Sequence, residues 1–267
     1  MYREILVPVQ EPAEVEPLVK FAASLLDADG VIRVLHVIPT TTLPEVTREW
    51  RSSVHLVVPA HEAGAALDVR VDPEVRAATD VPGEILESAE SHNVDAILLT
   101  LRGSRRSRNP FVGHTASAIL HHARATVLVL NRLALASGRV TRILVPTFRD
   151  QPSGSTLRLA EEISLKSEGA SVVTLALGPR DHAGAPPSEE VTSRGISITR
   201  KHAFIPAGIL GRRRRLPELI LQAAARERYG LLLVGEESEA VGGPLLTRRF
   251  LEELFRTAPC PVLAVRD

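Results

Sequence analysis

The chain has 267 residues, 44% of them apolar, which is enough for one large or two ordinary domains with a buried core. A net charge of zero and an aromatic content of 3% make nucleic acid an unexpected partner. Cys260 is the only cysteine, so an intrachain disulfide and a cysteine zinc cluster are excluded. No signal peptide and no apolar window near the ~18 residues of a membrane span are visible, so we predict a cytoplasmic protein.

Apolar runs alternate with amphipathic segments through the first half of the chain. Ile5–Val9 is typical of a buried strand, and the apolar residues of 15–26 recur at helical spacing. The further predicted strands are 31–38, 69–77, 97–99 and 127–130, and the further predicted helices are 44–67, 81–91 and 116–123. Pro73 places the third strand near an edge, and Pro59 is expected to end or kink its helix. This alternation predicts an α/β domain with a parallel sheet.

The pattern then begins again after a linker at 133–140. The run Ile143–Pro146 repeats Ile5–Pro8 at an offset of 143 − 5 = 138, and Val262 repeats Val127 at 262 − 127 = 135. Two nearly equal offsets indicate a duplicated domain, with boundaries at 1–132 and 141–267. The second half predicts helices at 157–165, 216–223 and 250–255 and strands at 143–146, 170–177, 196–202, 231–234 and 262–263.

One helix is expected to be shortened in the second copy. Residues 178–187 are rich in Gly, Pro and Ala, so only a short helix at 188–192 can replace the longer helix of the first copy.

The usual catalytic signatures are absent from the sequence. It contains no phosphate loop ending in Gly-Lys-Ser/Thr, no dinucleotide fingerprint, no His-Glu-x-x-His and no Gly-x-Ser-x-Gly. His121 and His122 are adjacent on a predicted helix and point about 100° apart, so we expect surface residues and no metal site. Cys260, between two prolines at the start of a strand, is expected to be a buried small residue.

A glycine-bounded, arginine-rich loop follows the predicted strand at 97–99. Nine residues separate Gly103 from Gly113, and the loop carries Arg102, Arg105, Arg106 and Arg108. Loops at the carboxyl end of a parallel strand that lead into a helix start are anion sites in α/β proteins. The arginines favour an anion such as a nucleotide or cyclic dinucleotide, with a solvated loop as the alternative. The run Arg212–Arg215 leaves the same choice between a partner and a solvated loop.

In these residues the chain resembles the universal stress protein family, whose nucleotide signature is Gly-x2-Gly-x9-Gly-Ser/Thr. Thr100 stands at the first glycine, Gly103 and Gly113 at the other two, and His114 at the hydroxyl position, with Thr115 next. Gln10 stands where the family has an aspartate that contacts adenine. The resemblance therefore implies ATP or another adenine nucleotide bound by Gln10, Gly103, Gly113, His114 and Thr115, with Arg102 and Arg105 as further anion contacts.

The resemblance extends over nearly the whole chain as two tandem copies. It implies two Rossmann-like (adenine nucleotide alpha hydrolase-like) domains, each a five-stranded parallel sheet of order 3-2-1-4-5 with helices on both faces. It also implies an intrachain pseudo-dimer formed through the fifth strands. In the second copy Phe148 replaces the aspartate, Gly235 fits the first glycine, Ser238 replaces the second, and Arg248–Arg249 replace the final pair. We expect no ligand there.

Three functions follow from this reading. The first is a non-enzymatic stress-response or regulatory protein that binds a nucleotide in the first domain only, acting with a protein partner or as a homodimer. The second is the cytoplasmic regulatory domain or subunit of a transporter, such as a cation/proton antiporter or an amino-acid permease, without a nucleotide. The third, weak ATP hydrolysis, is disfavoured because Gln10 lacks the charge that would help hold magnesium and no carboxylate is evident near the motif.

Overall fold

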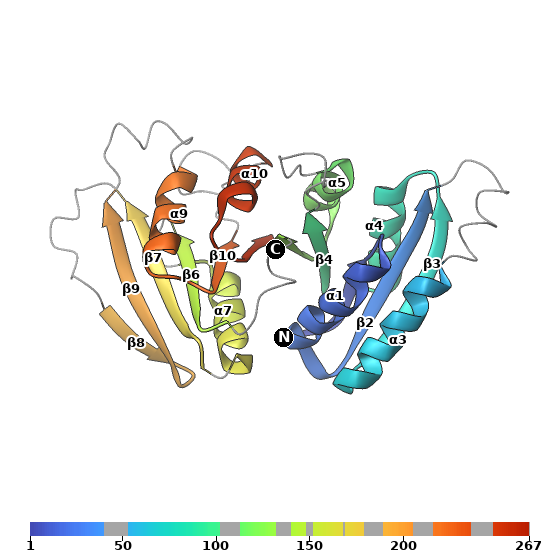
Figure 1. The fold of residues 1–267 in the computed structure, drawn as a ribbon, viewed down its shortest axis with the longest axis horizontal. Helices are drawn as coiled ribbons and strands as arrows, with labels where there is room; N and C mark the ends of the chain where they lie inside the picture. Colours follow the sequence, from blue (N-terminus) through green and yellow to red (C-terminus); the bar gives the residue numbers. More distant parts are fainter. Residues whose placement is uncertain are drawn as a thin grey trace. The chain divides into compact units, whose positions relative to one another are not determined.

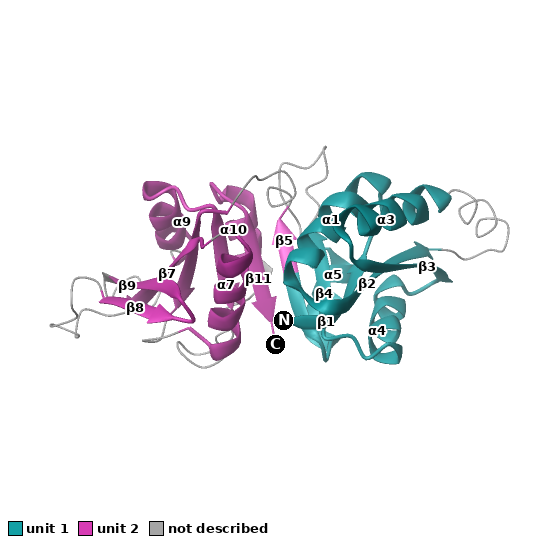
Figure 2. Cartoon of the chain, turned by 90° about the horizontal axis from the view of Figure 1, so that it is seen from below, with its two compact units in different colours: residues 1–100, 113–128, 267 teal, residues 101–112, 129–266 magenta. Residues whose placement is uncertain are grey.

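The computed structural model describes residues 1–39, 53–101, 113–131, 140–147, 152–167, 169–178, 189–204, 216–235 and 248–266. The chain divides into two compact units, shown in separate colours in Figure 2. Unit 1 contains Met1–Thr100 and Gly113–Leu128, and Val129–Arg266 falls in unit 2. Each unit is a sheet with helices packed on it (Figure 1).

Unit 1 alternates strands and helices as the apolar pattern predicts. Its strands are β1 (Tyr2–Pro8), β2 (Leu26–Pro39), β3 (Arg70–Ala78), β4 (Ala96–Leu101) and β5 (Thr126–Asn131), which begins in this unit. Its helices are α1 (Pro12–Leu25), α3 (Val54–Leu67), α4 (Val81–Ser91) and α5 (His114–His122).

The sheet of unit 1 has the order β3-β2-β1-β4-β5, which confirms the predicted order 3-2-1-4-5. β1 pairs in parallel with both β2 and β4, and β3 is the edge strand that Pro73 indicated. Helices α1 and α3 pack together on one face, and α4 lies on the opposite face with α5 packed against it (Figure 2). Burial on both faces explains why the central strands are continuous apolar runs.

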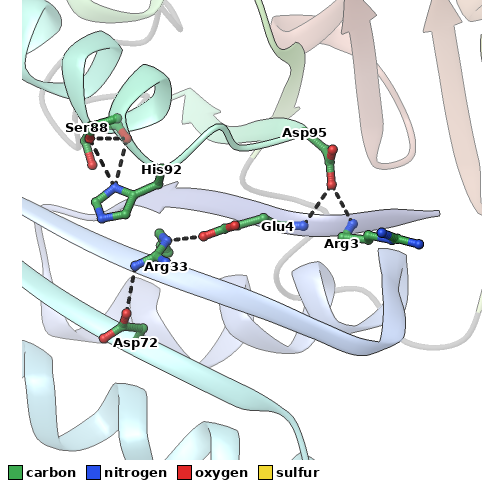
Figure 3. A network of polar contacts seen from close by, with 8 residues as sticks. Arg3, Glu4, Arg33, Asp72, Ser88, His92 and Asp95 are labelled. Atoms are coloured by element: carbon green, nitrogen blue, oxygen red, sulfur yellow. Dashed lines mark hydrogen bonds and ion pairs between the residues drawn. The ribbon is translucent and has the colours of Figure 1, made fainter.

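A ladder of charged side chains crosses three strands of unit 1 on the face that carries α4 (Figure 3). Arg33 on β2 donates to Glu4 on β1 and, over 2.7 Å, to Asp72 on β3. The pairing register sets Arg33 directly opposite Asp72. The ladder therefore satisfies one half-buried guanidinium while it holds β1, β2 and β3 in register.

Asp95 ties the start of β4 to the start of β1 (Figure 3). Its Oδ2 accepts hydrogen bonds from the backbone N–H groups of Arg3 at 2.6 Å and Glu4 at 2.9 Å. Its own N–H donates to the Glu4 carbonyl at 2.9 Å. These three bonds lie directly before the first pair of the parallel ladder, in which Ile5 is opposite Ala96.

Unit 2 repeats the same plan with one addition. Its strands are β6 (Arg142–Thr147), β7 (Ser171–Gly178), β8 (Glu189–Ser193), β9 (Ile196–Phe204), β10 (Leu231–Gly235) and β11 (Val262–Arg266), in the order β11-β10-β6-β7-β9-β8. Its helices are α7 (Gly154–Lys166), α9 (Leu216–Arg226) and α10 (Arg248–Thr257). All strands pair in parallel except β8, which is antiparallel to β9, so the predicted five-strand order is present with a sixth strand at its edge.

The short helix predicted at 188–192 is wrong, because this segment is strand β8. Arg194 and Gly195 both have positive φ, 50° and 79°, and form the two-residue turn of a hairpin between β8 and β9. Val191 on β8 stands opposite the buried Ile198. Two β-branched residues before such a turn favour a strand, and the Arg-Gly pair was the overlooked signal.

Pro59 does not end its helix, so this one of its two predicted effects is wrong. Helix α3 begins at Val54 and continues through Pro59 to Leu67, whereas residues 44–52 of the predicted helix lie outside the described residues. Val54 is 56% exposed, and the buried side of α3 is formed by other residues, namely Leu56, Ala60, Ala63 and Gly64. Packing against α1 and β3 therefore stabilises the helix despite the hydrogen bond that a proline removes.

A polar cluster in unit 2 is centred on Glu227, directly after α9. Its carboxylate accepts from Lys201 Nζ at 2.6 Å, from Arg142 at 2.8 Å and from the Tyr229 hydroxyl at 3.0 Å. The hydrogen bond from Lys201, followed by those from Arg142 and Tyr229, lowers the pKa of Glu227 to about 2. Burial, helped by the Glu227 carboxylate, raises the pKa of Tyr229. The cluster joins β6, β9 and the segment before β10.

We predict that Glu227→Gln lowers the free energy of unfolding at neutral pH by about 1 kcal/mol, since the group is partly exposed and screened. A carboxylate whose pKa falls from about 4.5 to about 2 on folding contributes stability above pH 4.5, and that contribution is lost as the pH falls toward 2. Urea unfolding at pH 7 and pH 3 measures the difference. Glu253→Gln, at an exposed ion pair with Arg256 on α10, is the matched control and should change little at either pH. An equal effect of both variants would contradict the prediction.

Candidate functional site

Gln10 and Gly113 lie at the same edge of the sheet of unit 1. Gln10 is exposed and follows the carboxyl end of β1, and α5 begins directly after Gly113. Helix α5 leads to β5, whose Thr126 N–H donates to the Asp95 carbonyl at the amino end of β4. The opposite end of α5, with Gly113, therefore faces the carboxyl edge. Because the strand order reverses between β1 and β4, this is the switch point at which open α/β sheets bind ligands.

Gly113 is the N-cap residue of α5, and the protein's own packing does not require a glycine there. Its φ of −59° and ψ of 165° are open to any residue. A Cβ built on Gly113 meets none of the described residues within 4 Å. Glycine has no side chain that could cap the first N–H groups of α5, and no side-chain cap is formed by the N-cap residue. Such a helix start suits a phosphate or another small anion.

The other predicted site residues divide into two groups. His114 is exposed and Thr115 half-buried, both on the first turn of α5 beside Gly113. Thr100 is half-buried and is the second-to-last residue of β4. Gly103, Arg102 and Arg105 lie outside the described residues.

Glu14, which the sequence interpretation overlooked, is a buried carboxylate beside Gln10. It is 5% exposed, and its Oε2 accepts from the N–H groups of Gln10 at 3.5 Å and Glu11 at 3.4 Å. We expected no carboxylate near this site, and Glu14 corrects that expectation. Its position three residues after Glu11, the spacing of a capping box, was the available signal. Since these N–H groups already face a carboxylate, the loop favours a base or ribose over a phosphate.

His36 on β2 also contacts this loop. Its Nδ1 lies 3.0 Å from the carbonyl oxygen of Val9, the residue before Gln10. No local sequence signal indicates this contact, because it depends on the pairing of β1 with β2. The loop that carries Gln10 is thus held by side chains from α1 and β2.

Two predictions about burial are confirmed. His121 and His122 are exposed on α5. Cys260 is 4% exposed, and burial raises the pKa of its thiol to about 11, so it is an inert core residue.

At the corresponding edge of unit 2, the space beside Gly235 is filled by the side chain of Thr156. Gly235 ends β10, and a Cβ added there would lie 1.9 Å from Thr156 Oγ1. Thr156, 2% exposed, is held by Ser153, the N-cap of α7, whose Oγ lies 2.7 Å from Thr156 Oγ1 and accepts from the Thr156 N–H. Gly235 therefore admits the Thr156 side chain, and α7 is capped by its own serine. Phe148 and Ser238 lie outside the described residues.

An open parallel sheet with an uncapped helix start at its switch point places unit 1 in the class of doubly wound α/β proteins that bind ligands at this edge. Residues 1–131 match the model of the universal stress protein family. No curated protein sequence matches the chain.

Solved structures extend the likeness in fold to both units. A universal stress protein from Archaeoglobus fulgidus is 15% identical with a TM-score of 0.69, covering 98% of this chain and 97% of that chain. A functionally unknown protein from Pseudomonas aeruginosa is 12% identical with a TM-score of 0.58, covering 99% of this chain and 92% of that chain. The cytoplasmic domain of a prokaryotic cation chloride cotransporter is 12% identical with a TM-score of 0.58, covering 100% of this chain and 96% of that chain.

We predict that Gly235→Ala destabilises unit 2 by about 1–3 kcal/mol, because the new methyl group overlaps Thr156. Combining it with Thr156→Ala, which removes the nearest atom, should recover part of that loss, so the two substitutions should not be additive. Denaturant unfolding of the two single variants and the double variant measures the coupling. Gly154→Ala, where a Cβ meets nothing within 4 Å, is the control and should stay within ~0.5 kcal/mol of the parent. Strict additivity would show that Gly235 has another role.

Proposed function

We propose that the chain is a non-enzymatic stress-response or regulatory protein that binds ATP or another adenine nucleotide in its first domain only. In this proposal residues 1–132 and 141–267 are two universal-stress-type domains, of which the second serves regulation or contact with a partner protein. The family of residues 1–131 supports the proposal for the first domain. The similar fold over the whole chain supports it for the second.

The observation that carries the nucleotide proposal is Gly113. Neither the backbone angles of Gly113 nor the described residues around it require a glycine, and the close approach of a ligand would explain one. It begins a helix at the switch point, where free N–H groups and the helix dipole favour negative charge. Gly235, at the same edge of unit 2, has a packing reason instead.

The proposed roles follow from position and chemistry. Gln10, exposed beyond β1, presents an amide that can donate to and accept from an adenine edge. The N–H groups at Gly113 and in the loop with Gly103 would bind the phosphates, assisted by His114 and Thr115 on the first turn of α5. Arg102 and Arg105 would add charge contacts to the same phosphates.

A regulatory role is favoured over catalysis by the residues around the proposed base site. Gln10 carries no charge for magnesium, and the Glu14 carboxylate already accepts two backbone N–H groups at distances of 3.5 and 3.4 Å. A carboxylate so engaged is poorly placed to orient a water molecule. We place the protein in the cytoplasm, in line with the cytoplasmic transporter domain that shares its fold.

A regulatory domain or subunit of a transporter is the second candidate function. The likeness to a cation chloride cotransporter's cytoplasmic domain favours it, as does the occupied edge of unit 2. Such a protein would act by contact with its transporter and need no nucleotide. Among the described residues, no helix is both long and apolar enough to cross a membrane. Co-purification with a transporter encoded beside it, in the absence of nucleotide, would favour this candidate.

We predict that the chain binds ATP and that Gly113→Asp weakens this binding at least ~tenfold, because the carboxylate occupies and repels at the phosphate position. Aspartate is also a good N-cap, so the variant should unfold at the same or a higher denaturant concentration than the parent. Isothermal titration with ATP and denaturant unfolding measure the two effects.

The matched control is Gly154→Asp, which places the same charge at the start of α7 in unit 2, where a Cβ also meets nothing within 4 Å. It should leave ATP affinity unchanged. Absence of heat with the parent protein would reject nucleotide binding, and an equal loss in both variants would reject its assignment to unit 1.

A further inference from the structure

We propose that His36 is a positioning residue of the base site, which holds the Val9 carbonyl so that the next residue, Gln10, presents its side chain to the base. This inference rests on the proposed nucleotide binding in unit 1. It adds a residue on β2 to the base site proposed for the segment that follows β1.

The register of β1 and β2 brings the two residues together. Pro8 is paired with Leu35 in the parallel ladder, which places His36 beside Val9, one residue beyond the end of β1. The Val9 N–H donates to the Leu35 carbonyl at 2.8 Å, and the His36 Nδ1 lies 3.0 Å from the Val9 carbonyl oxygen. Both polar backbone groups of Val9 are therefore bonded to β2, the second of them through a side chain. The ring contact extends the hold of β2 past the end of the sheet.

The chain that follows is held from the other side. The N–H groups of Gln10 and Glu11 lie 3.5 and 3.4 Å from Oε2 of Glu14 on α1. From Val9 to Glu11 the backbone is thus held by one side chain on β2 and one on α1. Val9 is 3% exposed, whereas Gln10 is exposed. The exposed Gln10 side chain can therefore reach a ligand, in a direction set by the held backbone.

The contact with a carbonyl oxygen determines which ring nitrogen of His36 carries a proton. A carbonyl oxygen only accepts, so the proton of the neutral imidazole is on Nδ1. An asparagine at 36 can place an N–H donor close to the same point, whereas a leucine of similar size cannot. Leucine would leave the carbonyl of a buried residue without its partner, and the loop would gain freedom that ligand binding has to remove.

The experiment compares His36→Leu with His36→Asn in the full chain. ATP affinity is measured by isothermal titration, stability by denaturant unfolding, and the freedom of the loop by amide hydrogen exchange of Val9, Gln10 and Glu11 without ligand. We expect His36→Leu to weaken ATP binding roughly tenfold and to speed exchange in the loop, and His36→Asn to restore both. A merely structural role would move stability without this rescue pattern in affinity. Lys20→Ala, on the exposed side of α1, is the control and should change none of the three.

The outcomes separate this inference from the proposal beneath it. If the parent binds ATP and His36→Leu binds it equally well, the positioning role is rejected while the nucleotide site stands. If the parent does not bind ATP, nucleotide binding fails, and unchanged exchange in His36→Leu would also reject the hold on the loop. If His36→Leu fails to fold, His36→Asn decides: affinity within twofold of the parent supports the role of the donor, and a tenfold loss overturns it.

Discussion

The parallel pairing of β1 with β4 is the constraint on which the candidate site depends. Asp95 secures it with hydrogen bonds to the N–H groups of Arg3 and Glu4 and from its own N–H to Glu4. Because the two strands are parallel neighbours, the carboxyl ends of both lie at one edge of the sheet, where the strand order reverses. Every residue assigned a role at the site follows one of these two strands or, as with His36, is held against them.

The carboxyl edges of the two sheets carry glycines in different surroundings. Gly113 precedes a helix with no side-chain cap, and a Cβ built there meets none of the described residues within 4 Å, whereas Gly235 accommodates the buried side chain of Thr156. Gly113 stands at the last glycine of the nucleotide motif and Gly235 at the first, and the sequence alone does not distinguish a glycine required by packing from one that is not. A match to a sequence motif therefore has to be interpreted together with the packing around its residues.

The polar networks of the two units serve the fold. In unit 1 the Glu4–Arg33–Asp72 ladder holds three strands in register, and His92 donates to the Ser88 carbonyl where α4 ends (Figure 3). In unit 2 Glu227 gathers Lys201, Arg142 and Tyr229.

The sequence by itself determined the class of fold and most of its elements. Burial on two faces requires continuous apolar strands and amphipathic helices, and both are visible as local patterns in the sequence. Helix α4, for example, was predicted with its observed bounds, Val81–Ser91. Gln10 and Gly113 could likewise be identified from their places after strands. Tertiary structure decided the rest. Strand β8 formed where a helix was expected, because its partner is β9. The contacts of His36 with Val9 and of Thr156 with Gly235 join residues 27 and 79 positions apart, a separation at which only pairing and packing can bring side chains together.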